Sequence, residues 1–502
     1  MTVASHSTIA SVRQRLRVSE WDPGLVVVLA AAAVFAGVFI FLALRRYEAF
    51  STARFDLGNM VQALWSVAHG HLFVVTDSSG RQISRLGSHV DPILGAFIPL
   101  WWIFPTPKLL LVAQPLIVAT GALPTYWIAR RWLWDWRTSA ACAAAYLLYP
   151  ALHWSVVFDF HPVTLATPLL LWCVWAIESR RPVLIGIFAT LSVMTKEEVG
   201  IAVAGLGLWV LFHHRRTRTA LCLIVGGLVW TAICVGIILP HFAPGGASPF
   251  ISRYGDLGAS PSSIIKTLLT HPGHSLRLLF STSRLDYLWQ LLYPLALLPV
   301  LAPAILIAIV PELLLNMLSN DATQYSIYYQ YTAVITPFLI VAMIGGIARA
   351  RRLAGAQGRI SARPGIIVSA LLATSLIAGF LHGPVPIGKL IPGGSTRASD
   401  QYTVSAHDLA MARAIAMIPA GVPVSATDPA GGRLSDRLRI YTWPVIGDAQ
   451  WVVVDTANPW LIDNRVKPWI NVPYVEALER TGQFDLVYYG YGVDVFRRKT
   501  SK

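Results

Sequence analysis

The feature that most constrains this chain is a series of apolar stretches that recur from residue 25 to residue 381. The longest contain about 20 residues, the length at which an α-helix crosses the hydrocarbon core of a bilayer. Only 13% of the 502 residues are charged, about half of what a soluble protein of this length needs to cover its surface. The sequence therefore predicts an α-helical, polytopic membrane protein. Its predicted apolar segments are 25–44, 93–104, 109–129, 138–155, 163–177, 183–195, 199–212, 219–239, 287–300, 303–318, 331–348 and 364–381.

Basic residues gather in short clusters between these segments. A net charge of +14 is also seen in nucleic-acid-binding proteins, but basic clusters confined to short loops are typical of the cytoplasmic side of a membrane protein. We therefore expect a multi-pass protein of the plasma membrane with a cytoplasmic N-terminus and no nucleic-acid partner. Segment 25–44 is too long for a typical signal peptide, which predicts an uncleaved anchor. The clusters are 13–17, 130–137, 213–218 and 349–352.

The same clusters set the expected topology. Residues 46–92 form a long outer loop, and 130–137 returns to the inside, so one crossing lies between them. We assign that crossing to 109–129 and place 93–104, with its Trp pair, at or within the interface. If both segments crossed, every later loop would change sides. The expected fold is a membrane bundle of about eleven transmembrane helices.

Beyond about residue 385 the long apolar stretches end. Short β-like stretches alternate there with helical patterns, which indicates a small α/β domain. The expected domains are a cytoplasmic segment 1–24, a membrane domain 25–384 and an extracytoplasmic α/β domain 385–502. The expected strands are 422–426, 451–455, 485–491 and 493–496, and the expected helices are 405–418 and 473–482.

Four polar motifs share the outer face in this topology, each next to an apolar segment. They are FD at 55–56, HVDP at 89–92, FDFHP at 158–162 and TKEE at 195–198. Carboxylates and imidazoles can supply a general base or bind a metal, and a lysine can hold a phosphate. Helix capping and snorkelling to water would account for each motif taken singly.

No motif has a strong metal-ligand spacing. HVD and DFH each place Asp and His two residues apart, which splays them on a helix but puts them on one side of an extended segment. We therefore assign no metal site and no certain cofactor. A divalent cation stays an open alternative, with Asp56, Asp159 and His161 as its weak candidate ligands.

Two further regions are candidates for substrate contact. Glu312 lies inside an apolar segment, where an ionisable residue is a functional candidate, although Pro311 beside it also suits a helix cap. The loop 320–331 ends in Gln330 and Tyr331, whose side chains suit sugar hydroxyls or an interfacial aromatic belt.

These motifs together resemble an uncharacterised family of multi-pass membrane proteins, domain of unknown function 2079. That family in turn is similar to the GT-C superfamily of membrane glycosyltransferases. The sequence departs from the acidic pair of that superfamily at DFH, where His161 stands in place of a second carboxylate. The text that carries the resemblance includes RFDLGNMVQALW, LGSHVDPILG, YLLYPALHWSVVFDFHP, TKEEVG and PELLLNMLSN.

The resemblance implies transfer of a sugar from a polyprenyl-phosphate donor to an envelope glycan, lipid or protein at the outer face of the membrane. Asp56 would be the general base, and His89 and Asp91 would orient acceptor or base. The phosphate would be held by cations from Lys196, Arg54, Arg81 and Arg85. The candidate substrate-binding residues are Arg54, Asp159, His161, Lys196, Glu197, Glu312, Gln330 and Tyr331.

Two other functions stay open. A secondary transporter would carry charged residues at mid-membrane and related halves; Glu312 is the one good candidate for such a charge, and related halves are not evident in the sequence. A non-catalytic protein of envelope assembly or lipid binding would use the α/β domain to bind a partner.

Overall fold

The first described helix, α2, runs from Pro23 to Glu48. Asp22 caps it by accepting a hydrogen bond from the Gly24 amide, and Pro23 at the first position suits a helix start. At about 1.5 Å per residue the helix is long enough to cross a bilayer. The computed structural model describes residues 22–243, 249–356, 364–461, 464–465 and 467–499, so most of the expected segment 1–24 lies outside the described residues.

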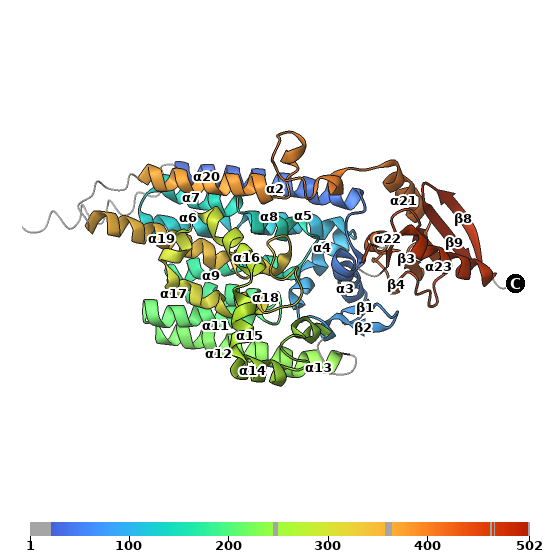
Figure 1. Ribbon diagram of the computed structural model, residues 1–502, viewed down its shortest axis with the longest axis horizontal. Coiled ribbons are helices and arrows are strands. Elements are labelled where there is room, and N and C mark those ends of the chain that lie inside the picture. The colour runs from blue at the N-terminus through green and yellow to red at the C-terminus, as the bar shows by residue number, and fades with distance from the viewer. Residues whose placement is uncertain (1–21, 244–248, 357–363, 462–463, 466, 500–502) are drawn as a thin grey trace, which may run out of the picture.

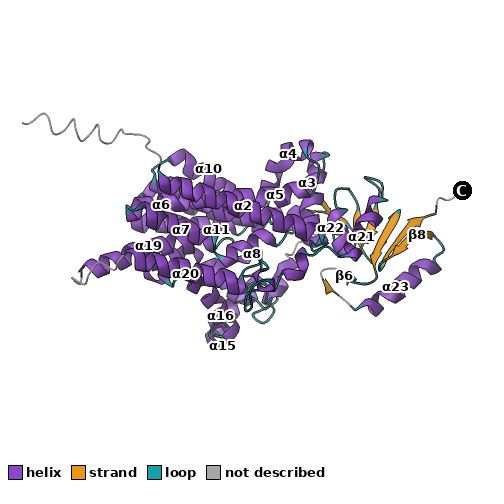
Figure 2. Ribbon diagram, turned by 90° about the horizontal axis from the view of Figure 1, so that it is seen from above, coloured by secondary structure: helices purple, strands orange, loops and turns teal. Residues whose placement is uncertain are grey.

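Helices make up a bundle whose long members lie along the longest axis of the molecule, and a mixed sheet lies at one end (Figure 1). The view from above places the sheet at the same end (Figure 2). The main bundle helices are α5 (Lys108–Ala119), α6 (Ala122–Leu133), α7 (Trp136–Leu147), α8 (Pro150–Val157), α9 (Ala166–Glu178), α10 (Pro182–Val193), α11 (Val199–Trp209), α12 (Thr217–Ile233), α19 (Thr336–Ala356) and α20 (Pro364–His382).

Within the described residues, four helical stretches are long and apolar enough to cross a membrane, or five if the bent pair α7–α8 is one span. Shorter apolar helices of 10–17 residues pack around them. The count of about eleven crossings stays a prediction. The four stretches are Pro23–Glu48, Lys108–Leu133, Thr217–Phe242 and Gly365–His382.

The basic loops lie together at one end of the bundle, which we call the basic end. Arg130 lies 4.0 Å from Asp22 at the start of α2. Arg131 contacts Glu178 at 3.3 Å, and Arg351 reaches Asp135 at 3.7 Å. Residue 130 and the start of α2 therefore lie at the same end of the bundle. The chain between the far end of α2 and residue 130 must then cross the bundle an odd number of times.

This arrangement contradicts the alternative in which both 93–104 and 109–129 cross. The segment 93–104 folds as a 3₁₀ turn Pro92–Phe97 and a short helix, α4 (Ile98–Ile103). Its 12 or so residues are too few for a span.

Segment 287–300 also differs from the apolar helix that was expected there. Helix α16 (Thr282–Leu292) ends there, and left-handed residues Ala296 and Leu297 break the chain into 3₁₀ turns.

The loop after α2 contains a π-helical turn η1 (Arg54–Gly58), helix α3 (Asn59–Ala68) and a two-stranded hairpin. Strands β1 (Val74–Thr76) and β2 (Gln82–Ser84) pair antiparallel. The apolar face of α3 packs on the bundle through Met60, Val61 and Leu64.

The C-terminal part folds as the expected mixture of strands and helices. Its sheet has the order β4-β3-β5-β9-β8, with β3 parallel to β4 and β5, and β9 antiparallel to β5 and β8. Strand β4 and helix α22 are not among the expected elements. The elements are α21 (Ala406–Ala416), β3 (Val424–Ala426), α22 (Asp428–Arg433), β4 (Ile440–Thr442), β5 (Trp451–Asp455), α23 (Pro468–Arg480), β8 (Phe484–Gly490) and β9 (Val493–Arg498).

Candidate active site

A cavity of about 630 Å³ lies at the end of the bundle opposite the basic end. Its wall includes Ala243, directly after the candidate span Thr217–Phe242. A Cβ on Gly87 would lie 2.4 Å from the Phe242 carbonyl oxygen, so the 85–91 loop packs directly on the end of that span. The cavity therefore lies level with the ends of apolar helices.

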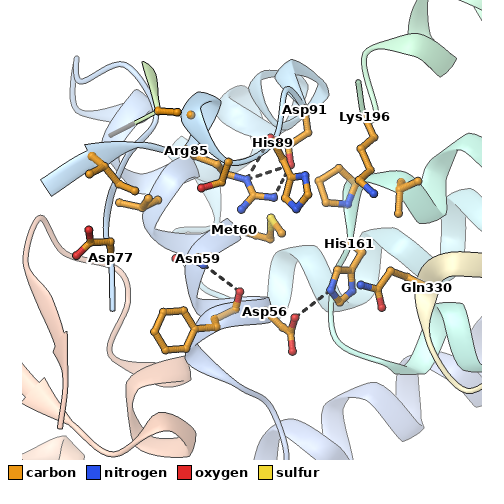
Figure 3. A pocket seen from close by; sticks show the side chains of 18 of the residues that line it. Asp56, Asn59, Met60, Asp77, Arg85, His89, Asp91, His161, Lys196 and Gln330 are labelled. Carbon is orange, nitrogen blue, oxygen red and sulfur yellow. Dashed lines mark hydrogen bonds and ion pairs between the residues drawn. The ribbon is translucent and has the colours of Figure 1, made fainter. Parts of the chain in front are cut away.

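The cavity brings together most of the predicted residues (Figure 3). Arg253 also lines it and was not predicted. Four predicted residues do not line it: Arg54, Asp159, Glu197 and Glu312. The predicted residues that do are Asp56, Arg81, Arg85, His89, Asp91, His161, Lys196, Gln330 and Tyr331.

Asp56 faces His161 across the cavity floor (Figure 3). The His161 Nδ1 donates to the Phe158 carbonyl at 3.0 Å, and its Nε2 lies 3.1 Å from Asp56 Oδ1. The Phe158 carbonyl can only accept, so Nδ1 is the donor there, and a hydrogen bond links Nε2 to Asp56 Oδ1. The Asp56 side chain is 31% exposed, and its Oδ2 has no hydrogen bond to any described residue. Asp56 therefore presents one carboxylate oxygen to the cavity.

Asp159 lies behind Asp56 and holds the turn that carries it. It accepts a hydrogen bond from the Ala53 amide at 2.9 Å and lies 3.4 Å from Arg46. Burial raises the Asp159 pKa to about 6, against the opposing pull of Arg46. Its φ of +50° is a left-handed conformation that a short polar side chain tolerates. Asp159 thus positions Asp56, and the expectation that it contacts substrate is not met.

One wall of the cavity carries the guanidinium of Arg85, which a buried ion pair holds in place. The Arg85 Nε lies 3.1 and 3.0 Å from the two carboxylate oxygens of Asp91, and Nη2 also bonds Asp91. The two side chains are 5% and 3% exposed. Asp91 is therefore occupied with holding Arg85, while Arg85 Nη1 has no partner among the described residues.

Lys196 forms a second cationic point beside this wall. Its ammonium pairs with Glu198, a residue outside the predicted set. Burial would lower the Lys196 pKa, but the carboxylates of Glu198 and Glu197 outweigh burial and raise it. Glu312, on helix α18 (Val310–Met317), acts in the same direction. The ammonium therefore stays charged.

Glu197 holds His89 in place. It accepts from His89 Nδ1 at 3.0 Å and from the Val90 amide at 2.9 Å. Burial would raise the Glu197 pKa, but His89 outweighs burial and lowers the pKa to about 2. Glu197 is thus a carboxylate behind the wall, and His89 is the group that meets the cavity.

The remaining wall comes from a turn and a loop far apart in sequence. Gln330 and Tyr331 lie on a 3₁₀ turn, Gln330–Thr332. The Arg253 guanidinium lies 5.6 Å from the centre of the Tyr331 ring and 3.6 Å from Asp321. This corner adds an amide, a phenol and a cation to the cavity.

Arg54, expected to bind phosphate, instead ties the C-terminal part to the Asp56 turn. Its guanidinium donates to the carbonyls of Thr76 (2.6 Å) and Ile440 (2.7 Å). Its amide donates to Asp428 Oδ1 at 3.1 Å. The side chain is 1% exposed, so burial among carbonyl acceptors removes it from the cavity.

No group of three or more His, Cys, Asp or Glu side chains is close enough to hold a metal ion anywhere in the part of the chain that the structure describes. Of the weak candidates, Asp159 is engaged by Arg46 and the Ala53 amide, while Asp56 and His161 face each other. The three side chains do not form one ligand set.

The family described as "Predicted membrane protein (DUF2079)" matches residues 46–476. The chain belongs to this family. The match begins just before the Asp56 turn and ends in helix α23, so it includes the cavity and three strands, β3, β4 and β5, of the five-stranded C-terminal sheet. No curated protein sequence matches this DUF2079 chain.

Solved structures give distant similarities. ArnT from Cupriavidus metallidurans bound to undecaprenyl phosphate overlaps with 11% identity and a TM-score of 0.46, covering 94% of this chain and 97% of that chain. The same protein in the apo state has 14% identity, a TM-score of 0.47 and the same coverage. An oligosaccharyltransferase from Archaeoglobus fulgidus has 14% identity and a TM-score of 0.41, covering 86% of this chain and 68% of that chain. Scores this low do not establish a common fold.

Three residues of this DUF2079 site were missed by sequence reasoning. Glu198 directly follows Glu197 in the KEE motif. Apolar segments flank this motif on both sides, and that position was the signal that the Glu198 charge would need a partner. Arg253 and Asp428 carry no local signal, because each reaches the site from a loop or helix remote in sequence.

Proposed function

We propose that this protein is a membrane glycosyltransferase that takes a sugar from a polyprenyl-phosphate donor and passes it to a cell-envelope acceptor at the outer face of the membrane. One observation carries the proposal. A single cavity at the ends of apolar helices combines a carboxylate, Asp56, with several cations, including Arg85 and Lys196. The sequence resemblance to GT-C glycosyltransferases supports the same reading.

The cations suit the phosphate of such a donor. A polyprenyl tail stays in the lipid, so its phosphate lies at the interface, level with the cavity. Arg85 offers Nη1, held in place by Asp91, and Lys196 offers a charged ammonium. Charge-assisted hydrogen bonds of this kind are the strong ones for phosphate. Arg253 and Arg81 also line the cavity, each beside a carboxylate of its own, Asp321 and Asp77.

The transfer step follows from these positions. An acceptor hydroxyl loses its proton to the open oxygen of Asp56 as its oxygen forms a bond to the anomeric carbon. The bond from that carbon to the phosphate oxygen breaks, and the polyprenyl phosphate leaves with the electron pair. Arg85 and Lys196 stabilise the charge that develops on the leaving phosphate. A single displacement of this kind inverts the anomeric configuration.

Other groups orient the reactants. His161 fixes the orientation of Asp56 through the hydrogen bond between Nε2 and Oδ1, and His89, Gln330 and Tyr331 offer polar contacts to sugar or acceptor hydroxyls. In the proposed orientation the basic end is cytoplasmic, so the cavity and the C-terminal part face outside. The proposed domain limits are 25–384 and 385–502.

The test is the pair Asp56→Asn and Asp56→Ala. Asparagine keeps the shape of the side chain but cannot take the proton, so transfer should fall by about 10²-fold or more, while binding of labelled polyprenyl phosphate is retained. The readout is the envelope glycan profile, measured by mass spectrometry, of a deletion strain complemented with each variant at matched protein level.

Asp77→Asn is the matched control, since Asp77 lines the same cavity but bonds within its own turn to Ser79 and Arg81. It should leave the profile unchanged. A wild-type profile with Asp56→Asn would remove Asp56 as the base.

A further inference from the structure

A second cavity, of about 670 Å³, lies at the basic end, on the far side of the bundle from Asp56. Its wall comes from the ends of helices α6, α11 and α19 and from the segment 301–305. Neither the proposed transfer reaction nor its substrates uses this cavity.

The rim of this cavity is cationic. Arg349 and Arg352 are exposed, and within the described ranges neither is paired with a carboxylate. Each donates one long hydrogen bond to a backbone carbonyl, Arg349 to Leu301 at 3.4 Å and Arg352 to Ala348 at 3.4 Å. Arg351 differs, because it is anchored by Thr138 at 2.6 Å and by Leu133 O at 3.2 Å.

Below the rim the wall is apolar and aromatic. The Trp132 and Trp209 rings lie 6.5 Å apart, centre to centre, and Ile305 and Val341 line the deeper part. Helix α19 has a glycine here, and a Cβ on Gly345 would lie 3.0 Å from Ala302 Cβ. Closely packed helices thus line the apolar part.

A positive rim above an apolar wall, at the ends of membrane helices, matches an anionic amphiphile. We propose that this cavity binds an anionic phospholipid of the surrounding leaflet, with its phosphate at Arg349 and Arg352 and an acyl chain against Trp132 and Trp209. Tryptophan is favoured at this depth of a bilayer, and basic pockets between helices on the cytoplasmic side hold anionic headgroups. A small soluble anion would make no favourable contact with the aromatic wall.

The experiment uses the full-length protein in nanodiscs of phosphatidylcholine, titrated with phosphatidylglycerol and followed by native mass spectrometry. We expect Arg349→Gln/Arg352→Gln to weaken phosphatidylglycerol binding by about tenfold to thirtyfold, the effect of two arginines at an anionic headgroup. The matched control is Arg215→Gln/Arg218→Gln, which removes two exposed arginines from the same end but outside this cavity, and should bind as wild type.

A third variant changes shape and not charge. Ala304 is exposed and lines the cavity, so Ala304→Phe should narrow the apolar part and weaken binding while the arginines remain. Equal weakening by both double variants would mean general attraction to the basic end and would overturn the proposal. Wild-type protein that binds soluble glycerol phosphate as tightly as phosphatidylglycerol would also overturn it, since the site would then be one for a free anion.

Discussion

Replacing Asp91 by asparagine tests whether this carboxylate acts on substrate or only holds Arg85. The substitution keeps the shape of the side chain and removes its charge. The Arg85 guanidinium is then left buried, with a side chain 5% exposed, and without a carboxylate. Removing one partner of a buried ion pair costs about 3–5 kcal/mol. We expect Asp91→Asn to lower the free energy of unfolding by that amount.

The double variant Arg85→Met/Asp91→Leu separates stability from function. Replacing a buried ion pair by apolar residues of similar size is often neutral or stabilising, so the free energy of unfolding should return to within about 1 kcal/mol of wild type. The same variant lacks the Nη1 donor. A charge-assisted hydrogen bond is worth about 1.5–3 kcal/mol, so polyprenyl phosphate should bind about 10- to 100-fold more weakly.

Denaturant titration in mild detergent, followed by tryptophan fluorescence, measures the first quantity, and binding of labelled polyprenyl phosphate measures the second. Asp77→Asn is the control, because its partner Arg81 is 66% exposed and an exposed pair contributes at most about 1 kcal/mol. The reasoning is refuted if Asp91→Asn is as stable as wild type yet inactive, since Asp91 would then act directly on substrate.

Three further predictions concern pH, the contact of the C-terminal part with the Asp56 turn, and topology. The hydrogen bond to Asp455 raises the pKa of His407 to about 9 from 6.5. Because water screens this partly exposed pair, its stabilisation is on the order of 1 kcal/mol; it is full below pH 6.5 and lost as pH rises through about 9. Unfolding of the C-terminal part followed across this range should show the loss, and His407→Gln should abolish the pH dependence. Asp428→Ala removes the acceptor of the Arg54 amide, which should cost about 1–3 kcal/mol and speed proteolysis between the bundle and the C-terminal part. Asp428→Asn keeps an acceptor and should restore the wild-type rate of proteolysis. Equal proteolysis of the two variants would argue against a role for this hydrogen bond. A reporter fused after Asp400 should be active outside the cytoplasm and one fused after Arg215 inside, and reversed signals would contradict the orientation.

Local patterns in the sequence were enough to predict many of the elements, although not β4 or α22. Apolar length predicted α2, α12 and α20, because transfer of a helix into lipid depends mainly on its own side chains. Short β-like stretches predicted β5 and β9 in the C-terminal part. Breaks within helices were harder to predict. Segment 287–300 is apolar enough to cross, yet the left-handed backbone at Ala296 and Leu297 interrupts the helix. Alanine and leucine are ordinary helix residues, so their side chains do not predict this break.

The cavity end was also predictable in part. Asp56, His89, His161 and Lys196 were expected on one face because each follows or precedes an apolar segment, and they line one cavity. That expectation needed only the order of crossings along the chain. It did not require knowing which side chain contacts which.

By itself, then, the sequence determined the membrane class, the positions of the apolar helices and the set of charged residues at their ends. Tertiary structure alone decided the role of each charge. Asp159 meets Arg46, and Arg54 meets Ile440, so both are turned away from the cavity, while Arg253 is brought into it. The physical reason is that burial and pairing are set by whichever distant segment packs alongside, and an ion pair or carbonyl contact leaves no pattern in the local sequence of either partner.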